Sequence, residues 1–101
     1  MTTERWKKLS LFEQLSNVAG DVERLVSTKE KFDSGQSKED YSDFYLDKVR
    51  NLVDMTIADP KNRGRGQELL DEIEEIERYR NAEVPKDYIL RYWNQYTQAI
   101  S

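Results

Sequence analysis

The clearest periodic pattern in the chain lies in residues 10–33, which have the sequence SLFEQLSNVAGDVERLVSTKEKFD. Its apolar residues alternate between spacings of four and three, which places their side chains on one face of an α-helix. They are Leu11, Leu15, Val18, Val22, Leu25 and Phe32, with Lys29 in the remaining position of the stripe. A second row, Phe12, Ala19 and Val26, widens this face to the breadth typical of a bundle helix. Because Ser10 and Glu13 have the spacing of a capping box, we expect this helix to span residues 11–32.

Three further helices are predicted. The second spans residues 39–58, with Ser37 or Asp40 as its cap. Its apolar residues keep the helical spacing at Tyr41, Phe44, Tyr45, Val49, Leu52, Val53, Thr56 and Ile57. Asp59 and Pro60 then have the pattern of an N-cap and a first-turn proline, so a third helix begins at residue 60, or at about residue 67 if stretch 61–66 is a loop, and ends at residue 80. Pro85 predicts a fourth helix over residues 85–100.

These four amphipathic segments predict one all-α domain over residues 1–101. Because the connections are short, successive helices are expected to be antiparallel neighbours in an up-down-up-down four-helix bundle. Trp6 and Leu9 precede the first helix and are expected to pack against its start or to cover one end of the bundle. Surplus apolar residues, such as Phe12, Val26 or Trp6, offer a surface for a homodimer.

The composition excludes several classes of function. The chain of 101 residues has 16 Lys and Arg against 20 Asp and Glu, a net charge of −4, and it has no His and no Cys. Without these two residue types there is no thiolate nucleophile, no imidazole base and no zinc site of the usual kind. We therefore predict no catalytic residues, no cofactor and no metal. No stretch approaches the roughly 18 apolar residues of a membrane helix, and no secretion signal is evident, so we expect no membrane association and a cytoplasmic location.

A basic segment, formed by Lys61, Arg63 and Arg65, is the first candidate binding site. It lies near the N-terminal end of the third predicted helix, where the helix dipole favours a bound anion. One interpretation is that the segment holds a phosphate group or a carboxylate of a partner. The other is a solvated connection whose cations pair with nearby acidic side chains.

Two polar strips form the second candidate. Glu13, Asn17 and Arg24 share one strip of the first helix, and Asp47, Arg50 and Asp54 share one strip of the second. If the strips face each other, they form an interhelical charge network that fixes the register of the bundle. The functional alternative is a carboxylate-lined metal or acid–base site, although the Glu-x-x-His pattern of helical di-iron proteins cannot form without His.

An aromatic set near the C-terminus, Tyr88, Tyr92, Trp93 and Tyr96, has two interpretations as well. Together with Arg91, these rings could stack on the bases of a single-stranded nucleic acid. The spacing of residues 88, 92 and 96 instead favours side chains that lie above one another and face the core.

The acidic stretch from Glu68 to Glu77 contains six carboxylates in ten residues. Such a stretch is either a solvated helix face or a surface for a basic protein, and the sequence does not choose between the two.

Two segments carry a resemblance to a known family. Residues 6–18, WKKLSLFEQLSNV, and residues 54–62, DMTIADPKN, resemble a family of small bacterial proteins of unassigned function, over roughly residues 5–97. The resemblance implies a small all-helical protein and supplies no activity. A looser architectural likeness connects the chain to small four-helix bundles, such as accessory proteins of diversity-generating retroelements and the proteins encoded in ribosomal RNA intervening sequences.

The function that the sequence favours is a non-catalytic protein-interaction adaptor or accessory subunit, whose partner is another protein or a second copy of the chain. Charged outer helix faces suit protein contacts, whereas the residue types needed for most chemistry are missing. The alternative is a nucleic-acid-associated accessory protein that uses the basic segment together with Arg5, Lys7 and Lys8. The salt dependence of binding distinguishes these two functions, because phosphate binding weakens steeply as the salt concentration rises.

Overall fold

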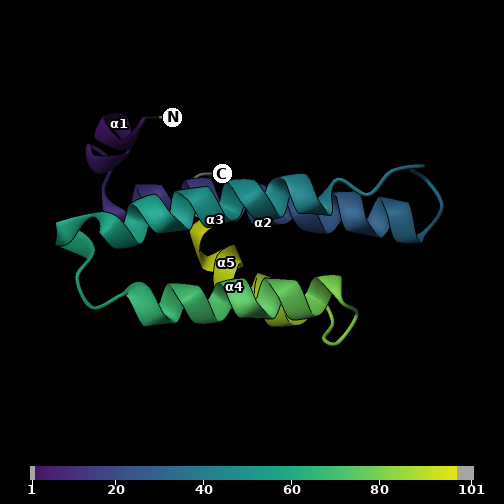
Figure 1. Ribbon diagram of the computed structural model, residues 1–101. Coiled ribbons are helices and arrows are strands. Elements are labelled where there is room, and N and C mark those ends of the chain that lie inside the picture. Colours follow the sequence, from purple (N-terminus) through teal and green to yellow (C-terminus); the bar gives the residue numbers. More distant parts are fainter. Residues whose placement is uncertain (1, 98–101) are drawn as a thin grey trace.

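The computed structural model describes residues 2–97, and the secondary structure of this part of the chain is entirely helical (Figure 1). Its elements are α1 (Thr3–Lys7), α2 (Leu11–Asp33), α3 (Ser42–Ala58), the 3-10 turn η1 (Pro60–Asn62), α4 (Gly66–Arg80) and α5 (Asp87–Thr97). The prediction of an all-α chain with four long helices is confirmed. The predicted end of the fourth helix, residues 98–100, lies outside the described residues.

The capping box predicted at the start of α2 is present. The Ser10 hydroxyl accepts a hydrogen bond from the Glu13 backbone N–H (3.1 Å), and the Glu13 carboxylate accepts one from the Ser10 N–H (3.0 Å). These two bonds satisfy backbone donors that a helix start leaves free. Asp59 also caps as predicted, since its side chain accepts from the Lys61 N–H at the first turn of η1.

Two predicted helix starts are wrong by a few residues. The second helix begins at Ser42 rather than at residue 39, because the Asp40 carboxylate accepts the Ser42 N–H (2.8 Å) and holds the preceding residues in a turn. The fourth begins at Asp87 rather than at residue 85. The third helix resolves into two elements, since the proline turn η1 ends at Asn62 and α4 begins at Gly66.

The short helix α1 is not predicted from the sequence, because five residues are too few to show a periodic pattern. The Thr2 hydroxyl caps it by accepting the Arg5 N–H. Trp6 lies on its inner side and is fully buried, and α1 packs against α3. The Trp6 carbonyl accepts a hydrogen bond from Gln14 near the start of α2. The alternative expectation, that Trp6 and Leu9 cover one end of the bundle, stays a prediction.

The core is formed by all four long helices. Helix α2 packs against α3 and α5, and α4 packs against the same two helices, so the four surround one apolar interior. Figure 1 shows α2 and α3 side by side above α4, with α5 rising from behind α4 toward the upper pair. Lys29 interrupts the apolar stripe of α2, and its ammonium lies 2.6 Å from the Asp33 carboxylate and 5.5 Å above the Tyr79 ring. No helix within residues 2–97 is long and apolar enough to cross a membrane.

Candidate functional site

A buried polar junction lies where α1, α2, α3 and η1 meet. Its side chains are Trp6, Gln14, Thr56, Asp59 and Asn62, and all five are buried. The Gln14 amide donates to the Trp6 carbonyl (2.8 Å) and to the Asp59 carboxylate (3.2 Å). The Asn62 amide donates to the Gln14 Oε1 and to the Thr56 carbonyl, both at 2.8 Å. The Trp6 indole N–H donates to the Thr56 hydroxyl (3.0 Å). The junction therefore fastens the chain start to the α3–η1 connection.

This junction also determines where the basic segment lies. The Lys61 ammonium is 2.6 Å from the Asp59 carboxylate and donates to the Lys7 carbonyl at 2.8 Å. The bond from Lys61 lowers the pKa of Asp59 below its ordinary value, and the bond from Gln14 acts in the same direction. Lys61 is therefore held against its own chain by two hydrogen bonds.

The other two cations of the basic segment are placed differently. Gly64, with φ of +92°, turns the chain between them in a conformation that favours glycine. Arg65 binds the Glu68 carboxylate one turn along α4 (2.6 Å), and the same carboxylate accepts the Tyr92 hydroxyl (2.7 Å). These two donors lower the pKa of Glu68. Arg63 is exposed and makes no ion pair within the described residues. Two of the three predicted anion ligands are thus already bound to carboxylates.

The two predicted polar strips do not pair with each other. On α2, Glu13 caps the helix start, Asn17 donates to the Glu13 carbonyl, and Arg24 binds Asp21 (3.0 Å). On α3, Arg50 pairs with Glu77 of α4, while Asp47 and Asp54 are exposed. The strips diverge because Asp47 and Arg50 line a hollow between α3 and α4, together with Glu77 and Arg80. Over residues 2–97, no three acidic side chains converge in a way that could hold a metal ion.

The C-terminal aromatic set divides between core and surface. Trp93 and Tyr96 are buried, and Tyr92 is partly buried with its hydroxyl on Glu68. Burial and that bond raise the pKa of the Tyr92 hydroxyl. Tyr88 is 52% exposed, with Arg91 over its ring at 5.7 Å. The expectation that Tyr88 faces the core is wrong, because the buried face of α5 follows Ile89, Trp93 and Tyr96, and Tyr88 lies outside it.

Three of the six carboxylates of the acidic stretch form ion pairs. Glu68, Glu75 and Glu77 pair with Arg65, Arg78 and Arg50 respectively. Glu72 differs, because one of its oxygens is buried without a hydrogen-bond partner. Burial, and secondly the nearby carboxylates led by Glu75, raise the pKa of Glu72 to about 7.

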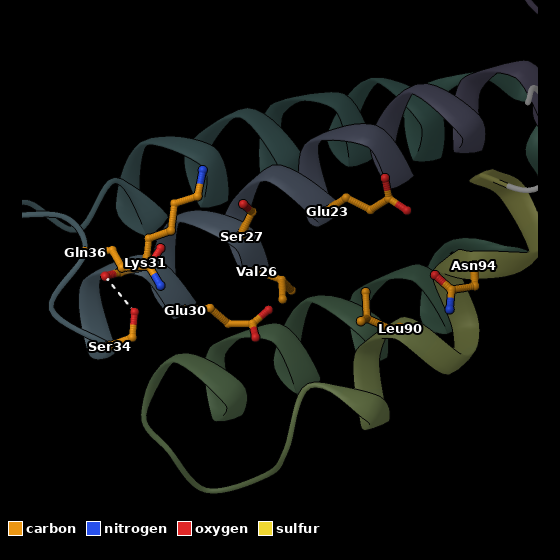
Figure 2. A pocket seen from close by; sticks show the side chains of 9 residues that line it. All are labelled: Glu23, Val26, Ser27, Glu30, Lys31, Ser34, Gln36, Leu90 and Asn94. Carbon is orange, nitrogen blue, oxygen red and sulfur yellow. Dashed lines mark hydrogen bonds between the residues drawn. The ribbon is translucent and has the colours of Figure 1, made fainter.

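An open groove of about 480 Å³ separates the C-terminal half of α2 from α5 (Figure 2). Val26 and Leu90 are its apolar side chains, while Glu23, Glu30 and Lys31 supply the charges. Glu30 is bound to Lys86 at 3.0 Å. Because Val26 is buried, as is Trp6, neither is available for the predicted dimer contact, whereas Phe12 is exposed.

The surface between α2 and α3 combines exposed aromatic side chains with cations. We call it the α2/α3 face and define it by two adjoining hollows of about 400 and 460 Å³ that share Arg24. Their lining includes Met55, Leu52 and Lys48 toward α1, and Tyr45, Tyr41 and Lys31 toward the α2–α3 connection. Phe44 lies beside them, with its ring 5.2 Å from that of Tyr45.

The most exposed aromatic side chains of this face were predicted to be part of the apolar stripe of α3. Phe44 is 57% exposed and Tyr41 is 51% exposed, so neither belongs to the core. The Lys48 ammonium lies 5.5 Å from the Phe44 ring and 5.9 Å from the Tyr45 ring. The i, i+4 spacing of Phe44 and Lys48 is visible in the sequence, but it does not distinguish this exposed arrangement from a broad buried face.

Comparison with protein-family models, with curated proteins and with solved structures gives no match to this chain. The resemblance to a family of small bacterial proteins stays a prediction.

Proposed function

We propose that the protein is a non-catalytic interaction protein, an adaptor or accessory subunit, that binds another protein. The observation that carries the proposal is the exposure of Phe44 and Tyr41 beside Lys48 on the α2/α3 face. Large aromatic side chains held open to water in this way are typical of protein-binding surfaces, where burial of their rings contributes most of the binding energy.

The arrangement of the polar groups supports an interaction protein over an enzyme. The side chains that converge most closely, Gln14, Asp59 and Asn62, donate to and accept from one another in the interior rather than facing an open cavity. Glu68, Glu75 and Glu77 form ion pairs on the surface, and such pairs stabilise a fold without taking part in chemistry.

The nucleic-acid alternative has weaker support. It depends on the basic segment, where Lys61 and Arg65 are bound to Asp59 and Glu68. A phosphate would have to displace these carboxylates, and the net charge of −4 opposes its approach. Only Arg63 is exposed without a pair among the described residues of this segment.

We also propose that the four long helices form an antiparallel up-down-up-down bundle. Contacts between opposite helix ends support it. Asp43, at the start of α3, pairs with Arg80, at the end of α4. Lys86, before α5, pairs with Glu30 near the end of α2, and Ser16 near the start of α2 donates to the Tyr96 carbonyl. The cytoplasmic location and the homodimer stay predictions from the sequence.

The test is isolation of the tagged protein from its native host at moderate salt. The wild type is compared with Phe44→Ala and, as a matched control, with Tyr88→Ala on α5, whose ring is similarly exposed. We expect a stoichiometric protein partner that survives nuclease treatment and is retained by Tyr88→Ala. Recovery of nuclease-sensitive material in its place, or of the tagged chain alone, would contradict the proposal.

A further inference from the structure

We infer that the α2/α3 face binds an acidic amphipathic helix of the partner protein. The inference rests on the proposed function and specifies the partner segment. The face extends along α3 from Met55 to Tyr41, which corresponds to about 21 Å at 1.5 Å per residue. A helix of about 14 residues has this length, and a groove between two helices is a common site for a third.

The charge of this face indicates the sign of the charge on the partner segment. Arg24, Lys31 and Lys48 are exposed, with 61% and 49% of the side-chain surface open at Arg24 and Lys48. Asp21 is the one acidic side chain that lines the two hollows, and only 8% of it is exposed. It already accepts from Arg24 at 3.0 Å and lies 4.0 Å from Lys48. A surplus of positive charge therefore remains on the surface of an acidic chain, which favours an acidic partner.

The neighbouring charges do not reverse this preference. Glu39 lies near the Tyr41 hydroxyl, where its hydrogen bond raises the pKa of Tyr41. This carboxylate is confined to the far end of the face, next to the α2–α3 connection. The exposed acids Asp43 and Asp47 of α3 line a hollow toward α4, and Asp54, seven residues after Asp47, shares its helical strip.

The apolar side chains of the face determine that the partner is amphipathic. Tyr41, Phe44 and Tyr45 form an aromatic group at one end, and Leu52 and Met55 lie in the hollow at the other. A purely acidic peptide would leave these rings open to water. A helix with apolar residues at i, i+3 or i+4 and i+7 would cover them, while its carboxylates would reach Lys48, Arg24 and Lys31.

Two other occupants are disfavoured by the same charges. A single-stranded nucleic acid could stack on the rings, but three cations are few for a phosphate chain that approaches a protein of net charge −4. In a symmetric dimer through this face, Lys48 and Arg24 would meet the same cations of the second copy. Both occupants become outcomes of the test.

The experiment is fluorescence anisotropy with a fluorescein-labelled peptide of about 14 residues that carries Leu at helical spacing and Glu elsewhere. The control peptide has Lys in place of every Glu, and a third probe is an oligothymidine. We expect saturable binding of the acidic peptide that weakens as salt rises, and no binding of the other two probes. Phe44→Ala and the double variant Lys31→Gln with Lys48→Gln should each weaken binding about 10-fold.

Matched variants on other surfaces serve as controls. Tyr88→Ala controls for the loss of an exposed ring, and Arg63→Gln with Arg91→Gln controls for the loss of two exposed cations. These controls should leave the affinity unchanged, and thermal melts by circular dichroism show that every variant folds. The double variant keeps the Arg24–Asp21 pair and so does not leave a buried carboxylate unpaired.

Several results would overturn the inference. They are absence of acidic-peptide binding, equal binding of the lysine peptide, binding of the oligothymidine instead, and equal losses in the control variants. Self-association through this face, detected by sedimentation and abolished by Phe44→Ala, would also overturn it. If a native partner is recovered and still binds Phe44→Ala and the double lysine variant, this inference fails while the proposed function stands. If no protein partner is recovered, the proposed function itself fails.

Discussion

The indole of Trp6 shows how one side chain connects distant parts of the chain. The ring is fully buried, and its N–H still donates to the Thr56 hydroxyl, which in turn donates to the Leu52 carbonyl. A buried N–H without a partner costs free energy, so this bond lowers the cost of burying the Trp6 ring. The residues of the buried polar junction thus hold α1 against α3 through directional hydrogen bonds as well as through apolar packing.

A double-mutant cycle tests this bond. Trp6→Phe removes the donor, and we expect it to lower the free energy of unfolding by about 1 to 3 kcal/mol, since it also leaves a small cavity. Thr56→Val removes the acceptor and should destabilise by a similar amount. The double variant should lose about 1 kcal/mol less unfolding free energy than the sum of the two single losses, as measured by urea denaturation. Strict additivity would show that the bond contributes nothing.

Glu72 gives a prediction about pH. Its pKa is raised to about 7, mainly by burial, whereas the unfolded chain releases this proton near pH 4.5. Between these values the folded state holds a proton that the unfolded state has lost, so the free energy of unfolding falls as the pH rises through this range and stays low above it. Glu72→Gln removes the cost, and we expect it to stabilise the protein by roughly 1 to 2 kcal/mol at about pH 8 and little at about pH 4.

The control for this measurement is Glu74→Gln, on the exposed side of the same helix. Thermal melts of both variants across the pH range should show a pH-dependent gain for Glu72→Gln only. A gain that is independent of pH would mean that the substitution acts through packing or helix propensity and that the carboxylate of Glu72 is not the cause.

At the level of single residues, the sequence predicts contacts between near neighbours in the chain but few of the contacts between distant residues. Ser10 and Glu13 lie three positions apart, so their reciprocal bonds follow from local spacing. Gln14 and Asn62 are 48 positions apart, and their contact depends on how the helices pack. The same holds for Phe44, whose exposure is decided by the angle at which α3 packs on its neighbours.

Two helices end in the same backbone motif with different residues. After α2, the Gly35 N–H donates to the Phe32 carbonyl and the Gln36 N–H to the Lys31 carbonyl. After α4, the Ala82 N–H donates to the Tyr79 carbonyl and the Glu83 N–H to the Arg78 carbonyl. Both ends are Schellman motifs, which require a positive φ at the residue after the cap. Gly35 has φ of +81°, and Ala82 has φ of +60°.

Exchanging these two residue types should have opposite effects. Ala82→Gly relieves a conformation that costs an L-residue about 1 kcal/mol, so we expect the free energy of unfolding to rise by roughly 0.5 to 1 kcal/mol. Gly35→Ala should lower it by a similar amount, because a Cβ at Gly35 would meet no other atom and only the backbone strain remains. Chemical denaturation of the two variants checks the signs, and a loss of stability in Ala82→Gly would contradict the assignment.

At the level of helices, the sequence predicts most of what is present. Long apolar stripes predict α2 and α3, and the Asp59–Pro60 pair predicts the break before α4. The predicted start of α3 is too early, because the Asp40 carboxylate accepts the Ser42 N–H and keeps the residues before Ser42 in a turn. Helix α1 is missed because its stability comes from burial of Trp6 rather than from its own sequence.

Residues 2–97 surround one core and form an elongated body, 42 by 24 by 23 Å, since α2 alone has 23 residues. Trp6 lies in α1 and Trp93 in α5, and both are fully buried in the same cluster. A single cluster shared by every helix predicts that no element unfolds by itself.

Single-tryptophan variants test this cooperativity. Trp93→Phe leaves Trp6 as the reporter, and Trp6→Phe leaves Trp93. For each variant we expect the fluorescence transition in urea to coincide with the loss of helix measured by far-ultraviolet circular dichroism. An earlier transition at Trp6 alone would show that α1 and the buried polar junction open before the remaining helices.

The buried polar junction also has a consequence for the order of synthesis. Its contacts join Trp6 and Gln14 to residues 50 and 48 positions further along the chain. A nascent chain therefore leaves the ribosome with the indole of Trp6 and the amide of Gln14 uncovered until Asn62 has emerged. Until then this junction cannot join α1 to the start of α2 and the end of α3, so the native packing of the first residues waits for the synthesis of residue 62.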